Sequence, residues 1–198
     1  MLDEKERKNY MCKRVLIIVA MLVVLCVVTV GCTPAEKCKP IQVACDDSKP
    51  LATRNMVHIA VVVRDVEKTA KAWGEMFDVE VPKSSLTDPL EKAHTRYHGK
   101  PTKAQAKLIF LKLDNLRVEL IEPVGGPSTW MEFLKTNGEG IHHIAFEIKG
   151  TDEQIANLEK KGMPLVQRGE WTAYTGGCYS YFDSLRQLGV MVELLENY

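Results

Sequence analysis

Two short motifs that contain possible metal ligands occur twice, in the same order, in this 198-residue chain. An H-I-A motif begins at His58 and again at His143, and a V-E-L motif has Glu119 and later Glu193 at its centre. Imidazole and carboxylate groups together suit Zn, Ni, Co, Mn or Fe(II). A single histidine in a strand is usually a structural residue, and a single glutamate in a strand usually faces the solvent. Their paired recurrence instead predicts that all four hold one divalent metal ion.

The expected strand geometry supports this prediction, because side chains alternate between two faces along a strand. Each glutamate stands between apolar residues, so a polar side chain interrupts an apolar pattern. A carboxylate at an inward position is costly unless it is paired or binds a metal. By the same alternation, His142 is expected to face away from its neighbour His143 and to be an outer-face or structural residue.

A metal with four protein ligands leaves two adjacent positions for the oxygens of a substrate. Two neighbouring oxygens can chelate there, and the metal then stabilises the enolate that forms when a proton leaves the carbon beside a carbonyl. A base must lie within hydrogen-bond reach of that proton. The four residues therefore permit proton-abstraction chemistry.

The motifs lie in two similar halves, and each half reads as a strand, a helix and then further strands. In the first half we expect a strand over 56–63, a helix over 66–77 capped by Asp65, and strands over 107–113 and 116–121. In the second half we expect a strand over 141–148, a helix over 152–161, and strands over 163–167, 178–183 and 190–195. A linker helix is expected over 128–135. The predicted fold class is α+β, with tandem paired βαβββ modules that form a curved sheet around a metal-binding cleft.

Two polar stretches, 82–103 and 168–175, are expected to be loops that shape a substrate pocket. Their aromatic residues Tyr97, Trp171 and Tyr174 are candidates for lining it. His94 and His98 also lie in the first stretch and are expected to be solvated, unless the loop carries them over the cleft.

The N-terminus has the pattern of an export signal. Residues 15–31 carry no charge and follow Lys13 and Arg14 directly, which favours sending the rest of the chain out of the cytoplasm. The run ends in Thr29-Val30-Gly31-Cys32, which resembles the lipobox of bacterial lipoproteins and implies that Cys32 is lipidated. An uncleaved signal anchor is the alternative. Both interpretations predict an extracytoplasmic, membrane-anchored protein.

The remaining domain boundaries follow from these patterns. We predict a signal peptide or anchor over 1–31, a tether over 32–54, and a folded domain over 55–197, with module one at 55–124, a linker at 125–140 and module two at 141–197. Cys38 and Cys45 in the tether either form a disulfide or stay free. Cys178 is expected to be a small buried hydrophobe.

Composition excludes some classes of protein. The 26 basic and 26 acidic residues give a formal net charge of zero, whereas a nucleic-acid partner usually requires a basic excess. At 45% apolar and 26% charged residues, the chain is predicted to fold and not to be disordered. Six cysteines are too few for a disulfide scaffold.

The motifs together resemble the vicinal oxygen chelate (VOC) superfamily, the group of glyoxalase I, methylmalonyl-CoA epimerase and bleomycin-resistance proteins. The segments that carry the resemblance are L-R-V-E-L-I-E-P-V-G-G-P-S, N-G-E-G-I-H-H-I-A-F and G-V-M-V-E-L-L-E. It covers roughly 55–197 and is greatest for the epimerase and glyoxalase branch. It implies paired βαβββ modules and metal ligands at His58, Glu119, His143 and Glu193. Epimerases often have Gln as the second ligand, so Glu119 matches glyoxalases, and bleomycin-resistance binders generally lack this set.

The resemblance implies a metal-dependent isomerase or lyase that acts on a small oxygenated acid or hydroxycarbonyl compound. Its base is Glu193 or Glu119, with Glu193 preferred. The export segment speaks against the coenzyme A esters of the epimerases, which are intracellular. Two alternatives stay open: a non-catalytic small-molecule binding protein, and a dioxygenase, which the two glutamates disfavour. The pairing of modules also permits a homodimer.

Overall fold

The computed structural model describes residue 51 and residues 53–198 of the chain. The predicted signal segment over 1–31 lies outside the described residues, and so do Cys32, Cys38 and Cys45 of the predicted tether. In the described part, no helix is long and apolar enough to cross a membrane.

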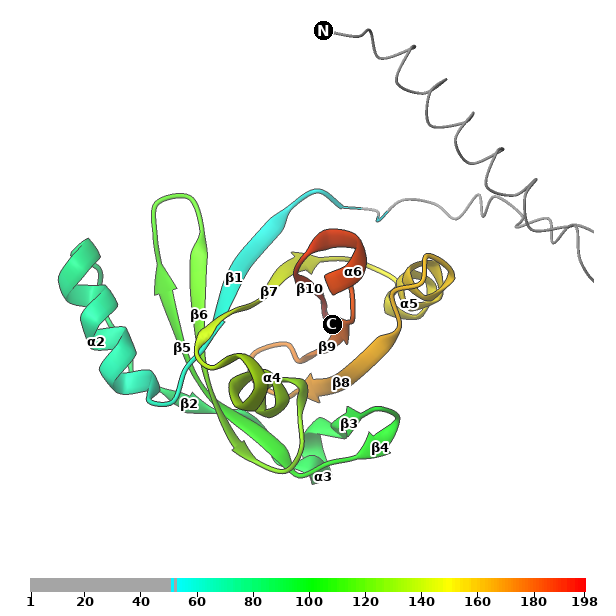
Figure 1. Ribbon diagram of the computed structural model, residues 1–198, viewed down its shortest axis with the longest axis horizontal. Helices are drawn as coiled ribbons and strands as arrows, with labels where there is room; N and C mark the ends of the chain where they lie inside the picture. The colour runs from blue at the N-terminus through cyan, green and yellow to red at the C-terminus, as the bar shows by residue number, and fades with distance from the viewer. Residues whose placement is uncertain (1–50, 52) are drawn as a thin grey trace, which may run out of the picture. The chain divides into compact units, whose positions relative to one another are not determined.

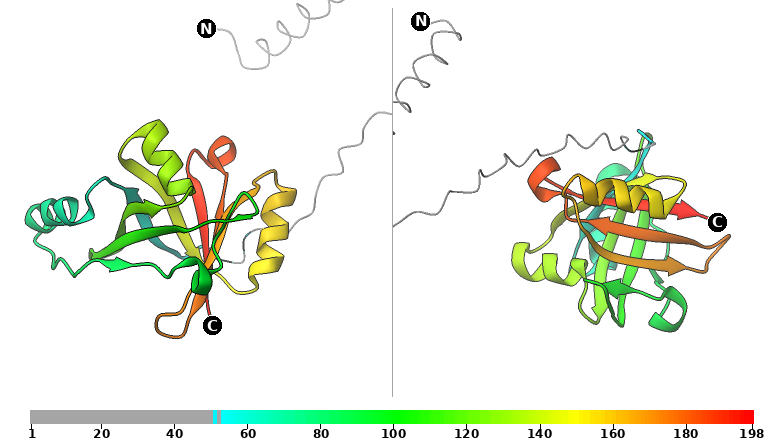
Figure 2. Two further views of the ribbon diagram at one scale, coloured as in Figure 1. Left: turned by 90° about the horizontal axis from the view of Figure 1, so that it is seen from below. Right: turned by 90° about the vertical axis from the view of Figure 1, so that its right-hand side faces the viewer.

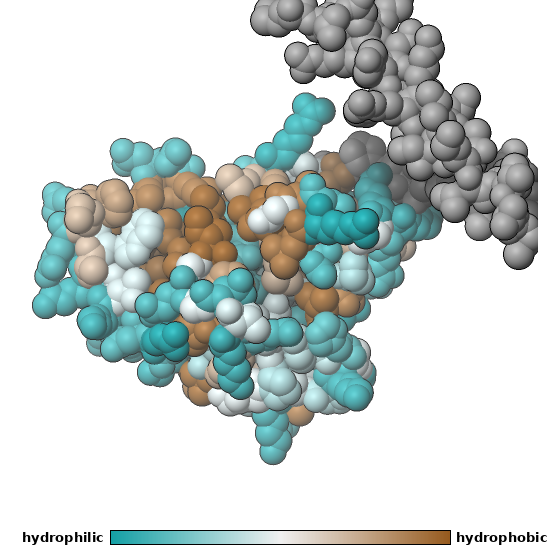
Figure 3. All heavy atoms as spheres, in the orientation of Figure 1, coloured by the Kyte–Doolittle hydropathy of each residue, from teal (hydrophilic) through white to brown (hydrophobic). Residues whose placement is uncertain are grey.

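One curled sheet of ten strands forms the frame of the domain (Figures 1 and 2). Its strand order is β2-β5-β6-β1-β7-β10-β9-β8-β3-β4. On the face seen in Figure 3, apolar surface lies across the middle of the view, and polar side chains surround it. The most exposed large apolar side chains of module one include Met76 and Phe77 at the end of its helix.

The βαβββ unit of module one is formed by one helix and four strands. These are β1 (Met56–Val62), α2 (Val66–Phe77), β2 (Ser85–Leu86), β5 (Ala104–Lys112) and β6 (Arg117–Gly125). The strands pair in the order β2-β5-β6-β1, and β1 runs parallel to β6.

Module two repeats this arrangement. Its elements are β7 (Gly140–Glu147), α5 (Thr151–Lys160), β8 (Leu165–Trp171), β9 (Gly177–Phe182) and β10 (Met191–Asn197). Its strands pair in the order β8-β9-β10-β7, and β7 runs parallel to β10. The modules join where β1 pairs with β7 in antiparallel fashion. The predicted fold of two βαβββ modules in one curved sheet is therefore confirmed.

Two apolar clusters attach the main helices to the outer face of the sheet. Val118 and Leu120 of β6 belong to the cluster that buries Val66 and Ala70 of α2. In module two, Val192 and Leu194 of β10 belong to the cluster around α5 (Ile155 and Leu158). Because side chains alternate along a strand, the glutamate between each apolar pair faces the inner side.

Side-chain caps fix where two of the helices begin. Asp65 precedes α2 and accepts a hydrogen bond from the backbone N–H of Lys68 at 2.9 Å, as predicted. Ser128 caps α4 (Thr129–Asn137) in the same way, through the backbone N–H of Met131 at 3.1 Å. Such caps satisfy backbone donors that would otherwise lack partners at a helix start.

The stretch 82–103 is more ordered than the predicted loop. Besides β2 it contains α3 (Leu90–Ala93), β3 (Arg96–Tyr97) and β4 (Lys100–Pro101). β2 pairs with β5 at one end of the strand order, and β3 pairs with β8 near the other end. β2 also supplies the strand of module one that the sequence did not locate. Two-residue strands carry no measurable periodicity, so their pairing is decided by tertiary contacts.

Among the predicted strands, β6 and β8 extend farthest beyond their predicted C-terminal ends. β6 continues to Gly125 and pairs with β5 along its whole length. β8 continues to Trp171, so the first part of the predicted loop over 168–175 is a strand paired with β9. A short helix, α6 (Leu185–Leu188), precedes β10 and was not predicted.

Candidate metal centre

Four adjacent strands each contribute one of the predicted metal ligands. The histidines come from the central pair β1 and β7, and the glutamates come from β6 and β10 on either side. The contributions are His58 from β1, Glu119 from β6, His143 from β7 and Glu193 from β10. All four side chains are buried, with exposed fractions of 5% or less. The internal repeat therefore places its four polar residues together on the inner face.

The alanine of each H-I-A motif makes room for these side chains. Each of the four residues has one of the two alanines as a strand partner: His58 with Ala145, His143 with Ala60, Glu119 with Ala60, and Glu193 with Ala145. Apart from glycine, alanine has the smallest side chain, so it leaves the space between the strands to the longer side chains of the histidines and glutamates. Both alanines are fully buried.

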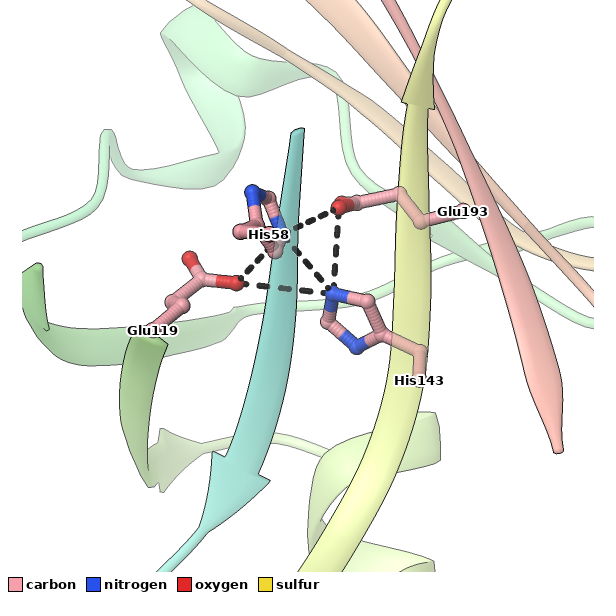
Figure 4. A group of neighbouring side chains, drawn as sticks. All are labelled: His58, Glu119, His143 and Glu193. Carbon is pink, nitrogen blue, oxygen red and sulfur yellow. Dashed lines mark hydrogen bonds and ion pairs between the residues drawn. The ribbon is translucent and has the colours of Figure 1, made fainter. Parts of the chain in front are cut away.

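The four ligand atoms converge on one point (Figure 4). The Nε2 atoms of His58 and His143 lie 3.2 Å apart. His58 Nε2 lies 3.1 Å from Glu119 Oε2 and 3.0 Å from Glu193 Oε2. His143 Nε2 lies 3.4 Å and 3.1 Å from the same two oxygens. All four atoms lie within 4.8 Å of one another.

These separations fit a divalent cation at the centre of the cluster. Two ligand atoms that are each about 2.1 Å from a metal lie about 3.0 Å apart at a right angle and about 3.4 Å apart at a tetrahedral angle. Moreover, the buried Oε2 atoms of Glu119 and Glu193 receive no hydrogen bond from any described residue, although each lies near two imidazoles. The oxygens therefore point toward the shared centre, and nitrogen and carboxylate donors suit several divalent metals.

The cluster also has strong internal electrostatics. Burial alone lowers the pKa of a histidine, but Glu119 and Glu193 outweigh it and raise the pKa of His58 to about 10. The pKa of His143 is raised for the same reason. Burial raises the pKa values of the two glutamates, but the charges of the histidines outweigh it and both pKa values are lowered. A cation that binds here must therefore displace protons from the imidazoles.

His142 does not face outward as predicted. The register between β7 and β1 shifts beside His143, and such a bulge interrupts the alternation of side chains. His142 is 1% exposed, and its Nδ1 lies 2.9 Å from Nδ1 of His143. Its Nε2 lies 3.1 Å from the hydroxyl of Thr129. The structural role expected as one alternative for His142 agrees with these contacts, whereas the outer-face placement is wrong because strict alternation does not hold at a bulge.

Two aromatic residues that the sequence reasoning missed stand beside the glutamates. Tyr181 of β9 is the strand partner of Glu193, and Phe110 of β5 is the strand partner of Glu119. Tyr181 is 2% exposed, and its ring centroid lies 4.9 Å from that of His143. Burial, followed by the charges of both glutamates, raises the pKa of Tyr181 well above its ordinary value, so the phenol stays protonated. The Y-S-Y alternation in the predicted strand 178–183 was the available signal.

A cavity of about 400 Å³ opens onto the cluster. His58, Glu119 and Glu193 contribute to its wall. Much of the remaining wall is aromatic or apolar, including Phe110, Trp130, Trp171, Tyr174, Tyr179 and Leu195. This size and this lining are typical of sites for small molecules.

The stretch 82–103 closes part of this cavity. Residues 85–88 line it, and the Asp88 carboxylate accepts hydrogen bonds from the N–H and the hydroxyl of Thr172 at 2.8 and 2.7 Å. Thr172 lies in the loop between β8 and β9. The two segments that were predicted to shape the pocket are therefore fastened to each other.

The predicted pocket residues have different locations. Trp171 and Tyr174 line the cavity, as proposed from the sequence. Tyr97 does not: it donates a hydrogen bond to Glu132 of α4 and lines a second cavity. The placement of Tyr97 in the pocket is corrected accordingly, because β3 pairs with the outer end of the sheet. His94 lies 3.2 Å from Glu170, and neither it nor His98 lines the first cavity.

Comparisons with known proteins identify the family of the chain. Residues 57–182 match the family model described as Glyoxalase/Bleomycin resistance protein/Dioxygenase superfamily. The uncharacterized protein YqjC of Bacillus subtilis is 30% identical over 92 residues, which are 46% of this chain and 66% of YqjC. The mitochondrial methylmalonyl-CoA epimerase of Mus musculus is 30% identical over 105 residues, which are 52% of this chain and 51% of the epimerase. This chain therefore spans between half and two thirds of the length of these two relatives.

Solved structures show the same fold. Methylmalonyl-CoA epimerase from Mycobacterium tuberculosis superimposes with a TM-score of 0.55 at 15% identity, covering 76% of this chain and 92% of the epimerase. The hypothetical protein BH1468 from Bacillus halodurans superimposes with a TM-score of 0.53 at 20% identity, covering 73% and 94%. At these identities the likeness concerns the fold alone. Because the family model matches well over half of the chain, this protein belongs to the glyoxalase/bleomycin resistance protein/dioxygenase superfamily.

Proposed function

We propose that this protein is a metal-dependent isomerase or lyase of the glyoxalase/epimerase type, which removes a proton from a carbon beside a carbonyl. The observation that carries this proposal is the buried set of two imidazoles and two carboxylates at the wall of a cavity of about 400 Å³. A buried carboxylate pair of this kind is costly unless a cation compensates it.

The roles of the residues follow from their chemistry. His58 and His143 hold the metal through Nε2, with Glu119 and Glu193 as the other two ligands. A bound divalent ion supplies a Lewis acid that stabilises negative charge on the carbonyl oxygen of a substrate. One of the two glutamates accepts the proton, since both reach the cavity. The aromatic wall limits the access of water to the reacting carbon.

The substrate class is proposed from two sources. The names of the relatives include methylmalonyl-CoA epimerases, and one solved structure is of such an epimerase with methylmalonyl-CoA. This supports a carbonyl compound with an acidic neighbouring C–H. The predicted export segment supports a small oxygenated acid or a hydroxycarbonyl compound instead of a coenzyme A ester.

Exchange of the substrate proton with D₂O tests the proposal directly. Methylmalonyl-CoA, free methylmalonate and a small α-hydroxyketone are incubated with the protein and Co(II), Ni(II), Zn(II) or Mn(II), and mass spectrometry measures the deuterium incorporated. Metal-dependent exchange that EDTA abolishes supports the proposal. A metal-loaded protein that binds one of these compounds tightly but exchanges no proton contradicts it.

That contradicting outcome describes the second candidate, a small-molecule binding protein. The aromatic lining of the cavity favours it, because Trp130, Trp171 and Tyr179 offer broad apolar contacts to a ligand without taking part in a reaction. A dioxygenase remains disfavoured, because both closing strands carry a glutamate where that class uses one carboxylate.

We also propose, from the N-terminal sequence, that the chain is exported and anchored to the membrane through Cys32. The support is the uncharged run over 15–31 and the lipobox-like Thr29 to Cys32. Labelling of the protein with an alkyne fatty acid in a bacterial host, compared between the wild type and Cys32→Ser, tests this. Label on the wild type alone is the expected result, and an unlabelled protein in the cytoplasm contradicts it.

A further inference from the structure

The cavity at the metal centre has an arginine at its rim. Among the described residues that line this cavity, Arg117 is the one lysine or arginine. It lies two residues before Glu119 on β6, so the alternation of side chains places both on the inner face of the sheet. Arg117 is also the strand partner of His58, but it is exposed whereas His58 is buried. The guanidinium therefore lies outward from the metal ligands, where the cavity meets the solvent.

An aromatic ring connects this rim with the metal centre. The centre of the Phe110 ring lies 5.9 Å from Cζ of Arg117 and 5.9 Å from the centre of the His58 ring. The ring attracts the cation through its π electrons, and an attraction of this kind uses none of the N–H donors. No hydrogen bond or ion pair joins Arg117 to another described residue. Its donors are therefore available to a ligand.

The acidic side chains of the same wall already have partners. Outside the metal centre, the partners are Thr172 for Asp88, Asn197 for Glu147 and His94 for Glu170. The unpaired group of this wall is thus a cation, and it suits an anionic part of a ligand. The surrounding carboxylates repel a doubly charged phosphate more strongly than a singly charged carboxylate, so they favour the carboxylate.

The internal repeat shows that the sheet itself does not require an arginine here. The equivalent residue of module two is Met191, the strand partner of His143. Met191 is 7% exposed and lines the second cavity, not the first. Because β1 and β7 are antiparallel, the two equivalent positions lie toward opposite ends of the inner face. The cation lies at the end that opens into the cavity of the metal centre.

We infer that Arg117 binds a carboxylate of the substrate, separate from the two neighbouring oxygens that chelate the metal. This inference rests on the proposed function and narrows its substrate class to organic acids whose carboxylate lies away from the reacting carbon. A guanidinium matches a carboxylate through two parallel N–H···O bonds. Arg117 is accordingly a residue that determines specificity and takes no part in the proton transfer.

Two hydroxamates of matched length test this inference on the full-length protein loaded with Co(II). Succinic acid monohydroxamate has two neighbouring oxygens for the metal and a carboxylate at its other end, and its amide has an uncharged group there. The visible absorption of the bound Co(II) reports the binding of each. We expect the acid to bind the wild type about fivefold more tightly than the amide, since solvent weakens an ion pair at an exposed arginine.

Variants assign this preference to one side chain. In Arg117→Gln the preference for the acid is expected to vanish, and Arg117→Lys is expected to keep part of it, because lysine retains the charge but not the paired donors. Lys112→Gln is the matched control. Lys112 is a strand partner of Arg117 and does not line the cavity, so this variant is expected to prefer the acid as the wild type does. Circular dichroism verifies that the variants are folded.

The outcomes separate this inference from the proposed function. Equal affinity of the wild type for acid and amide overturns the carboxylate site alone, and so does an equal loss of preference in Lys112→Gln and Arg117→Gln. Tighter binding of an analogue with a phosphonate in place of the carboxylate overturns the choice of a carboxylate. A wild type that binds no Co(II), or that binds neither hydroxamate when loaded, contradicts the proposed function itself.

Discussion

The alanine of each H-I-A motif adjoins the candidate metal centre, two residues after the histidine that contributes a ligand atom. Ala60 is the strand partner of both His143 and Glu119, and Ala145 is the partner of both His58 and Glu193. A larger side chain at either position would occupy the space where the four ligand atoms meet. The motif therefore combines a ligand with the gap that the ligands of the neighbouring strands require.

Replacement of Ala60 by Val tests this reading. We expect Ala60→Val to lose most of the metal affinity and to cost about 1–3 kcal/mol of unfolding free energy, because extra methyl groups overpack a closed site. Isothermal titration with Co(II) and urea unfolding measure the two effects. Ile59→Val, on the opposite face of the same strand, is the control, and equal metal affinity in Ala60→Val and the control would contradict the account.

The two imidazoles also set a dependence of stability on pH when no metal is bound. The two glutamates raise the pKa of His58 from 6.5 to about 10, so the folded state binds more protons than the unfolded state between these values. The stabilisation is complete below about pH 6.5 and is lost as the pH rises toward 10. The free energy of unfolding in EDTA is therefore expected to fall from pH 6.5 to pH 10.

Urea unfolding at several pH values measures this trend, with His58→Gln as the control. The variant lacks the titrating imidazole, so its unfolding free energy should depend less on pH in this window. A wild-type stability that rises across the window would contradict the electrostatic account. With metal bound, the unfolding free energy is expected to rise with pH instead, because metal binding requires neutral histidines.

At the scale of elements, α2 shows how a local cap supports a distant site. The Asp65 side chain accepts a hydrogen bond from the backbone N–H of Lys68 at the start of α2. The helix packs on β5 and β6, and β6 carries Glu119. We expect Asp65→Ala to cost about 1 kcal/mol, the usual value for a lost N-cap, without changing the metal affinity. Thermal unfolding and Co(II) titration measure the two quantities. Asp65→Asn is the control, since it can still cap, and a loss as large in Asp65→Asn would contradict the cap.

The long elements could be predicted from the sequence because they carry periodic signals. The helix over 66–77 was predicted with its observed bounds, since its apolar residues recur at helical spacing. The short strands β2, β3 and β4 could not be predicted, because two residues hold no period and their pairing depends on partners distant in sequence. β8 was predicted too short because its second half is polar and is held by pairing with β9.

For the site, the repeated motifs located four residues that the structure brings together. They could not reveal Tyr181 or the orientation of His142. The position of Tyr181 depends on which strand lies next to β10, and the orientation of His142 depends on a bulge. Both are properties of the sheet and not of the motif. Sequence patterns thus indicated which residues meet but not what supports them.

At the scale of the whole molecule, the curled sheet joins two modules so that each supplies half of one centre. Each module contributes one histidine and one glutamate, and the junction of β1 with β7 brings the halves together. Neither module alone has enough ligands for a stable site. Metal binding is therefore expected to stabilise the complete domain, by about 2.7 kcal/mol at a free metal concentration 100 times the Kd.

The metal content of the full-length protein, purified in detergent without an affinity tag, tests the central claim most directly. Mass spectrometry of the metals, compared between the wild type and His143→Ala, gives the ratio of metal to chain. The account predicts about one divalent transition metal per wild-type chain and its loss in the variant. A wild type that stays without metal after incubation with Ni(II), Co(II), Zn(II) and Mn(II), or a variant that keeps the full amount, would contradict it.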